Sequence, residues 1–161
     1  MRIDYLADHK DLVPAIAKWF FGEWSCFYPG KGLKDFEEMV LERANRDRLP
    51  LALVAMEGTE LLGIGCLKAK DMGTRPELTP WLAGMYVASE RRGRGIGAAL
   101  VRAVEENAAG LGITKLYLHT PGSADFYARL GWRVREKTEY CGCGVTIMEK
   151  DLPALKSPGR E

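Results

Sequence analysis

The sequence has few of the residues that bind metal ions in proteins. It contains two histidines and four cysteines among 161 residues. A zinc site usually combines two closely spaced pairs of such ligands, whereas only Cys141 and Cys143 form a close pair here. We therefore expect no metal. The N-terminal residues do not resemble an export signal, so we also expect the thiols to be reduced.

The sequence also lacks an excess of one charge and any long hydrophobic stretch. Lys and Arg number 23 against 22 Asp and Glu, a formal net charge of +1. Such a balance gives no general attraction to nucleic acids or anionic membranes. Every apolar stretch is too short to cross a bilayer. We therefore expect a cytoplasmic protein with no nucleic-acid or membrane partner.

What the sequence does contain is typical of one folded domain. Apolar residues make up 47% and charged residues 28% of the chain, and neither repeats nor a linker divide it. We expect a single domain over residues 1–155, followed by a polar tail over residues 156–161.

Hydrophobic spacing predicts a mixed α/β domain in the order β-α-α-β-β-β-α-β-α-β-β. Alternating or continuous apolar runs predict strands at Arg2–Tyr5, Leu51–Met56, Leu61–Leu67, Trp81–Val87, Lys115–Thr120, Trp132–Tyr140 and Val145–Asp151. Apolar residues at helical spacing predict helices from Asp11, around Phe36 to Ala44, from Ile96, and over Ser123–Leu130.

The most informative segment is the basic, glycine-rich stretch Arg91–Ala98, between a predicted strand and a predicted helix. The first backbone N–H groups of a helix lack acceptors within it, and the helix dipole adds partial positive charge there. Glycines allow a bound group to approach the backbone closely. Several N–H groups and three arginines can therefore converge on one anion, and pyrophosphate is the ligand that we expect there.

Other interpretations of this stretch differ in how well they fit. A Walker P-loop is excluded, because neither Lys-Ser nor Lys-Thr follows the glycines. Gly93, Gly95 and Ala98 do satisfy the dinucleotide pattern G-x-G-x-x-A, which usually opens a first βαβ unit and precedes an acidic residue about 20 positions on. Here the pattern lies in mid-chain, and the next strand ends with His119 and Thr120. A solvated turn with glycine caps is the remaining alternative.

The same segment resembles the acetyl-CoA loop of the GNAT superfamily of N-acetyltransferases, whose pattern is R/Q-x-x-G-x-G/A. Arg92, Gly95 and Gly97 occupy its fixed positions, while Ser89 replaces the family's usual proline. Residues 126–132 (FYARLGW) are similar to the family's FYxxLGF helix. Glu23-Trp24 and residues 116–120 (LYLHT) resemble the branch that contains the animal actin N-terminal acetyltransferase, which indicates an amine or a peptide N-terminus as acceptor.

The resemblance implies the GNAT fold, with a mixed central sheet of about seven strands flanked by about four helices. It implies acetyl-CoA as cofactor, CoA as product, and two central strands that splay apart beside the thioester. The pantetheine arm is expected along a strand edge, and the pyrophosphate on the loop. The cofactor-binding residues implied are Met85, Tyr86, Val87, Arg92, Gly93, Arg94, Gly95, Ile96, Gly97, Ala98 and Tyr127. Arg91, Arg92 and Arg94 are the candidates for the remaining phosphate.

The catalytic residues follow from the same resemblance and from elementary acid–base chemistry. An amine must lose a proton to act as nucleophile, and the leaving thiolate must gain one. Tyr127 is the candidate general acid; the alternative is an aromatic residue of the core that only hydrogen-bonds CoA. His119 or Glu23 is the candidate base, and for each a purely structural role is the alternative. An N–H near Met85 is expected to polarise the thioester oxygen.

Aromatic side chains near these positions can build the rigid apolar walls of an acceptor pocket. For each of them a position in the core is the alternative, and we expect one or two to face the pocket. The candidate substrate-binding residues are Glu23, Trp24, Phe27, Tyr28, Trp81 and His119. Residues 141–144 (CGCG) are expected at the tip of the last hairpin, where thiols are open to oxidation.

These observations support three functions. The first is an acetyl-CoA-dependent N-acetyltransferase that acts by direct attack in a ternary complex on a primary amine, either a small molecule or a peptide N-terminus. The second is a non-catalytic module that binds or senses acyl-CoA. The third is a dinucleotide-binding reductase. The family resemblance further suggests a homodimer.

Overall fold

The computed structural model describes residues 1–153 and confirms the mixed α/β architecture. Seven strands and four α-helices follow the predicted order. The strands are β1 Arg2–Tyr5, β2 Leu51–Glu57, β3 Glu60–Lys68, β4 Trp81–Val87, β5 Lys115–Thr120, β6 Arg133–Tyr140 and β7 Cys143–Asp151. The helices are α1 Val13–Trp24, α2 Leu33–Leu41, α3 Ile96–Gly110 and α4 Ala124–Ala128. The expected domain boundary at residue 155 and the tail 156–161 lie outside the described residues.

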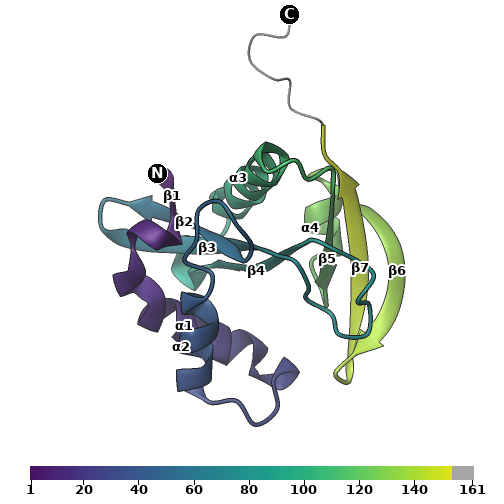
Figure 1. Ribbon diagram of the computed structural model, residues 1–161, viewed down its shortest axis with the longest axis horizontal. Helices are drawn as coiled ribbons and strands as arrows, with labels where there is room; N and C mark the ends of the chain where they lie inside the picture. Colours follow the sequence, from purple (N-terminus) through teal and green to yellow (C-terminus); the bar gives the residue numbers. More distant parts are fainter. Residues whose placement is uncertain (154–161) are drawn as a thin grey trace, which may run out of the picture.

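The strands form one seven-stranded sheet in the order β1-β2-β3-β4-β5-β7-β6. All neighbours are antiparallel except β4 and β5, which run parallel. Figure 1 shows β5, β7 and β6 turned away from the rest of the sheet, so that the molecule has two halves that meet at β4 and β5.

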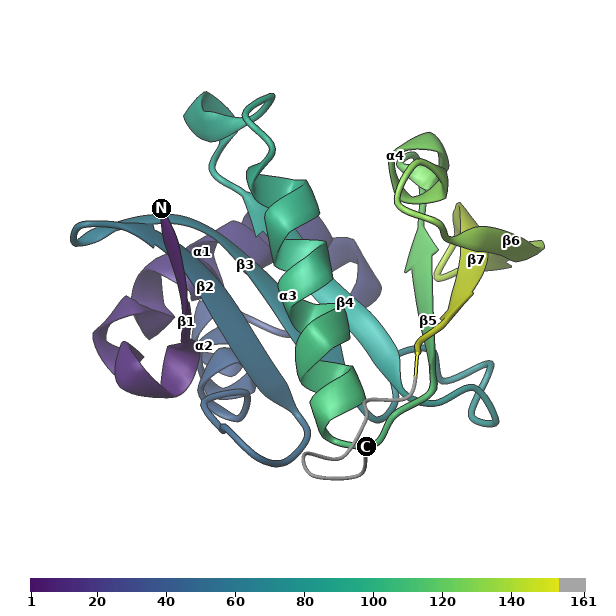
Figure 2. The same cartoon turned by 90° about the horizontal axis from the view of Figure 1, so that it is seen from above.

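Helices cover both faces of the β2-β3-β4 half (Figures 1 and 2). Helix α1 buries Val13, Ile16, Ala17 and Phe20, which fall at the i, i+3, i+4, i+7 spacing of one helix face. Together with α2 it packs on one side of the sheet. Helix α3 packs on the other side through a second row of apolar residues. Strands β2 and β3 are therefore buried on both faces, which explains their continuous apolar sequences.

Three helices have boundaries that differ from those the spacing predicts. The last one, expected over Ser123–Leu130, spans Ala124–Ala128. The helix expected from Asp11 begins at Val13, because Lys10–Leu12 form a 3-10 turn before it. The second helix ends at Leu41, although Arg43 continues the turn through a hydrogen bond from its N–H to the Val40 carbonyl. The apolar stripe that suggested a longer helix is thus partly made by residues beyond its end.

The turn after α4 explains why Gly-Trp follows Phe-Tyr-x-x-Leu in the second motif. The N–H of Trp132 donates to the Tyr127 carbonyl at 3.1 Å, and Gly131 adopts φ +94°. This is a Schellman ending, which requires a left-handed residue and places an apolar residue against the last helical turn. Trp132 and Tyr127 are accordingly both buried and in edge-to-face contact. The motif therefore holds Tyr127 in a defined position.

The β6–β7 hairpin closes more tightly than expected. Cys141 and Gly142 alone form its loop, with φ +52° and +81°, and Cys143 already pairs with Tyr140 as the first residue of β7. Positive φ at both loop residues is typical of the tight turns that match the twist of paired strands. The four-residue tip expected at residues 141–144 is therefore a two-residue loop.

Within residues 1–153, no helix is both long and apolar enough to cross a membrane. The same residues contain no group of three or more His, Cys, Asp or Glu side chains placed to hold a metal ion. All four cysteines are free thiols.

Candidate active site

Strand β4 separates from β5 in the middle of the sheet. The two strands are in register only at Trp81 and Tyr117, so the edge of β4 over Met85–Val87 is not paired with β5. On its other side β4 pairs with β3, and the register shifts at Gly84, whose φ is +59°. This left-handed region of the backbone favours glycine, which has no Cβ. The free edge presents backbone groups with which an extended ligand can pair.

The glycine-rich loop joins this free edge to α3. Gly93 and Gly95 both have φ +81°, and nothing lies within 4 Å of a Cβ built on either. Gly95 is the residue before α3, and no side chain caps the helix. The hydrogen bond from Ala99 N to Gly95 O, 3.1 Å long, is the first of the helix. The earlier N–H groups therefore lack helical acceptors and are open to an anion.

The three loop arginines have different surroundings. Arg91 forms an ion pair with Glu60. Arg92 donates from Nε to the Val87 carbonyl at 3.0 Å. Arg94 is exposed and has neither a hydrogen bond nor an ion pair with any residue that the structure describes. Of the three, Arg94 is therefore the side chain that is free to meet a ligand.

A cavity of about 200 Å³ lies between β4 and β5, on the side of α1 and α2. It contains six of the side chains that the sequence singles out for catalysis or acceptor binding. These are Glu23, Trp24, Phe27, Tyr28, His119 and Tyr127, and Met85 of β4 joins them. Residues from four distant stretches of the chain thus converge on one small space.

His119 in this cavity is held by a carboxylate that the sequence analysis does not single out. Its Nε2 lies 3.0 Å from Asp71 Oδ2, and Lys68 Nζ lies 3.2 Å from the other oxygen. Burial opposes ionisation of Asp71, but the hydrogen bonds from His119 and Lys68 outweigh it, so the pKa of this carboxyl lies below its usual value. Asp71 is therefore an anion that fixes the orientation of the His119 ring.

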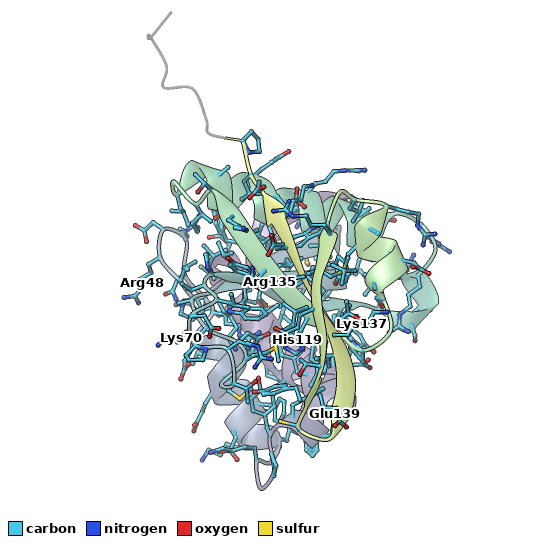
Figure 3. All side chains as sticks on the ribbon, turned by 90° about the vertical axis from the view of Figure 1, so that its right-hand side faces the viewer. Arg48, Lys70, His119, Arg135, Lys137 and Glu139 are labelled. Atoms are coloured by element: carbon cyan, nitrogen blue, oxygen red, sulfur yellow. The ribbon has the colours of Figure 1, made fainter. Side chains whose placement is uncertain are left out.

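The other ring nitrogen of His119 is closed off. Nδ1 is buried and has no hydrogen-bond partner among residues 1–153. Phe27, Trp81 and Tyr140 surround the ring, with centroid distances of 6.1, 5.9 and 5.6 Å. Figure 3 shows His119 in the middle of the molecule beside β6 and β7, whereas Arg135 and Lys137 project along β6. His119 is thus well oriented but poorly accessible.

Tyr127 is 8% exposed and its side chain lines the cavity. Burial raises the pKa of its phenol to about 12. The hydroxyl is therefore protonated throughout the neutral range and acts as a hydrogen-bond donor. It has no hydrogen-bond partner among the residues that the structure describes, so a bound ligand can receive its proton.

One expected acceptor residue is placed elsewhere. Trp81 is fully buried and does not line the cavity, because its indole Nε1 donates to the Leu78 carbonyl at 2.6 Å inside a separate apolar cluster. Trp81 thus occupies the core, which is the alternative that the sequence leaves open for each of these aromatic residues. Its ring instead packs against His119 and supports the pocket from behind. Glu23, in contrast, is exposed at the C-terminal end of α1, at the rim of the cavity.

Arg43 and Tyr140 also line the cavity, and the sequence analysis does not place either of them there. Arg43 appears in the sequence only as part of an amphipathic stripe, yet its side chain is 5% exposed. Burial disfavours its charge, but the Cys66 sulfur, Tyr28 and Asp71 favour it, and the pKa of Arg43 stays above its ordinary value. The cavity therefore contains a buried cation.

A comparison of the sequence with protein-family models identifies the family of the chain. The acetyltransferase (GNAT) family model matches residues 13–132, about three quarters of the chain. The chain belongs to this family and is an acetyltransferase. The match covers the helices α1 and α2, the free edge of β4, the glycine-rich loop, and the α4 motif through Trp132.

Solved structures with the same fold cover the chain almost completely. An aminoglycoside 6'-N-acetyltransferase complexed with coenzyme A has a TM-score of 0.75 at 19% identity, over 98% of this chain and 99% of that one. The aminoglycoside 6'-N-acetyltransferase of Enterococcus faecium has a TM-score of 0.71 and 20% sequence identity, over 98% of this chain and 99% of that one. YncA of Salmonella typhimurium, solved with acetyl-CoA, has a TM-score of 0.71 and 15% sequence identity, over 99% of this chain and 98% of that one. Such identities establish a common fold, and no curated protein matches the sequence.

Proposed function

We propose that this acetyltransferase moves the acetyl group of acetyl-CoA to a primary amine by direct attack in a ternary complex. The observation that carries the proposal is the free edge of β4. It runs from the cavity that contains Tyr127 and Glu23 to the anion-binding loop before α3. One extended ligand with a pyrophosphate at one end and a thioester at the other fits this path, and structural relatives were solved with coenzyme A and acetyl-CoA.

The donor is bound mainly by backbone groups. The pyrophosphate accepts hydrogen bonds from N–H groups between Arg92 and Ala98, which are unpaired and lie at the positive end of the α3 dipole. The pantetheine amides pair with Met85 and Tyr86, because the Val87 carbonyl already accepts a hydrogen bond from Arg92. Arg94 is assigned to the remaining phosphate.

The chemical step needs three groups. The amine nitrogen attacks the thioester carbon, and the new C–N bond forms while charge develops on the carbonyl oxygen. The N–H of Met85, at the bulge of β4, stabilises that charge. The C–S bond then breaks, and Tyr127 donates a hydrogen bond and finally a proton to the departing sulfur. The proton lost from the amine goes to a base.

We assign proton removal to Glu23, acting through water, because its carboxylate is exposed at the cavity rim. His119 is held by Asp71 and its free nitrogen is closed to solvent, so its role is to shape the pocket. Glu23→Gln is expected to lower kcat about 100-fold, and His119→Gln to lower it less than tenfold. The reverse result would reassign the base.

The first test is binding, followed by turnover. Acetyl-CoA at 100 times its dissociation constant should stabilise the protein by about 2.7 kcal/mol, visible as a raised melting temperature. NADH should have no such effect, and a shift with NADH alone would support a reductase instead. Release of CoA on addition of primary amines then measures transfer. Binding without turnover of any amine would support the non-catalytic acyl-CoA module.

A further inference from the structure

Arg43 is a buried cation that has no ion-pair partner within residues 1–153. The residue lies two positions after the end of α2, and its side chain is 5% exposed at the wall of the cavity. Its Nη1 lies 3.3 Å from the Cys66 sulfur, and its guanidinium lies 5.3 Å from the centre of the Phe20 ring. A thiol is a weak acceptor and a ring face a weak partner, so several guanidinium N–H groups remain available.

The other charges of the cavity do not neutralise Arg43. Asp71 is occupied by Lys68 and His119, at 3.2 and 3.0 Å. Glu23 is exposed, so water screens its charge. No carboxylate within residues 1–153 forms an ion pair with Arg43. Arg43 thus has no direct ion-pair partner in the deep part of the cavity, although Asp71 acts on its charge from a distance.

Gly84 leaves the space that the side chain of Arg43 occupies. A Cβ built on Gly84 would lie 2.8 Å from Arg43 Nη1 and 3.0 Å from Phe20 Cζ. The guanidinium thus packs directly against the bulge of β4, beside the place proposed for the acetyl group. A buried charge is stable only when it is paired, and a planar guanidinium pairs best with a carboxylate.

We propose that Arg43 binds a carboxylate of the acceptor, so that the acceptor is a small amine that also carries a carboxylate, of the size of an amino acid. This inference rests on the proposed acetyl transfer and names its substrate class. The volume of about 200 Å³ is below the range of roughly 300–1,000 Å³ for drug-sized ligands.

The test compares matched acceptors on the wild-type enzyme. CoA release is measured with the twenty common L-amino acids, β-alanine and γ-aminobutyrate, each beside its carboxamide. The carboxamide keeps the amine and the side chain but removes the negative charge. For the best acceptor, kcat/KM is expected to be about 10- to 100-fold higher for the carboxylate, which corresponds to one charge-assisted hydrogen-bond pair. The amine of a carboxamide is less basic, which favours it as nucleophile, so a preference for the carboxylate is a stringent result.

Two substitutions then locate the effect. Arg43→Gln is expected to raise KM for the amino acid about 10- to 100-fold while leaving KM for its carboxamide and for acetyl-CoA unchanged. Arg43→Lys keeps the charge but loses the planar fork, and is expected to recover part of the affinity. Arg48→Gln is the matched control, because Arg48 is an exposed arginine that contacts only Asn45 and lies outside the cavity (Figure 3).

Each result has a distinct meaning. If acetyl-CoA neither binds nor releases CoA with any amine, the proposed function itself fails. If the carboxamides or other uncharged amines are acetylated as well as or better than the carboxylates, acetyl transfer stands and the carboxylate site is overturned. Equal loss of both acceptor types in Arg43→Gln would also overturn it. Should that variant not fold, the wild-type comparison decides alone.

Discussion

At the scale of single residues, Tyr127 combines two properties that a proton donor needs. The Schellman turn after α4 fixes its backbone, and burial raises the pKa of its phenol to about 12. A group with this pKa remains protonated throughout the neutral pH range. The hydroxyl faces a cavity rather than a protein acceptor. A ligand in the cavity can therefore accept a hydrogen bond or the proton from this hydroxyl.

Tyr127→Phe removes this proton and little else. We expect kcat to fall about 100-fold, because general acid catalysis contributes roughly 100- to 10,000-fold, while the dissociation constant of acetyl-CoA stays within about threefold. Steady-state kinetics and calorimetric titration measure the two quantities. Tyr117→Phe is the control, since Tyr117 lies outside the cavity. Unchanged kcat in Tyr127→Phe would mean that this tyrosine is only a core aromatic.

Arg94 makes a second prediction at this scale. It is the loop arginine without a protein partner, so Arg94→Ala is expected to raise KM for acetyl-CoA about fivefold, the value of one exposed ion pair. With 3'-dephospho-acetyl-CoA as donor the same substitution should change KM less than twofold. An equal effect on both donors would show that Arg94 does not contact the 3'-phosphate.

At the scale of elements, one carboxylate joins the three strands of the outer half-sheet. Glu149 of β7 is 8% exposed and accepts hydrogen bonds from Arg135 and Arg133 of β6, at 2.9 and 2.8 Å. Lys115 of β5 lies 3.2 Å away. These cations outweigh burial and lower the pKa of Glu149 to about 2. The three strands are thus held together by ion pairs as well as by backbone hydrogen bonds.

The stability of the protein is therefore expected to depend on acid pH through Glu149. The folded-state pKa lies below the unfolded value, so the contribution is present above about pH 4.5 and is lost as the pH falls towards 2. We expect Glu149→Gln to lower the free energy of unfolding by about 2 kcal/mol at pH 7 and to flatten this dependence, as measured by urea denaturation. Glu139→Gln is the control, because Glu139 is exposed on β6 (Figure 3). Parallel pH curves for wild type and Glu149→Gln would contradict the assignment.

At the scale of the whole molecule, the two half-sheets are joined by little backbone pairing. Only Trp81 and Tyr117 are in register between β4 and β5, whereas β5 and β7 pair over their whole length. The gap is where the donor is proposed to bind, so the ligand would complete the sheet. Binding and the cohesion of the two halves are therefore linked.

Hydrogen exchange tests this link. Acetyl-CoA is expected to slow amide exchange at least tenfold over Met85–Val87 and over Arg92–Ala98, because these N–H groups gain acceptors. The β6–β7 hairpin, which is already fully paired, should change less than twofold. Protection confined to the hairpin, or spread evenly over the chain, would contradict binding along the edge of β4.

Most of the elements could be predicted because their signals are local. Strand Lys115–Thr120 and the start of α3 at Ile96 agree with the structure, since apolar alternation and a glycine cap are properties of neighbouring residues. The glycine-rich loop could be recognised for the same reason, because its residues are contiguous in the chain. The roles of Arg43 and Asp71 could not be predicted, because each depends on partners far away along the chain. Whether Trp81 lies in the pocket or in the core could not be predicted from its residue type, because packing decides it, and its ring is buried in the core.

The sequence by itself thus determined the order of the elements, the glycine-rich loop and the α4 motif, because each depends on residues within one turn or one strand. The tertiary structure alone decided which side chains share the cavity. It brought Asp71 to His119 and Arg43 to the bulge at Gly84, and it left Arg43 without an ion-pair partner in the part of the chain that the structure describes. Such pairings depend on how the sheet separates between β4 and β5 and on how α1 and α2 pack against it, and no local pattern encodes these distances.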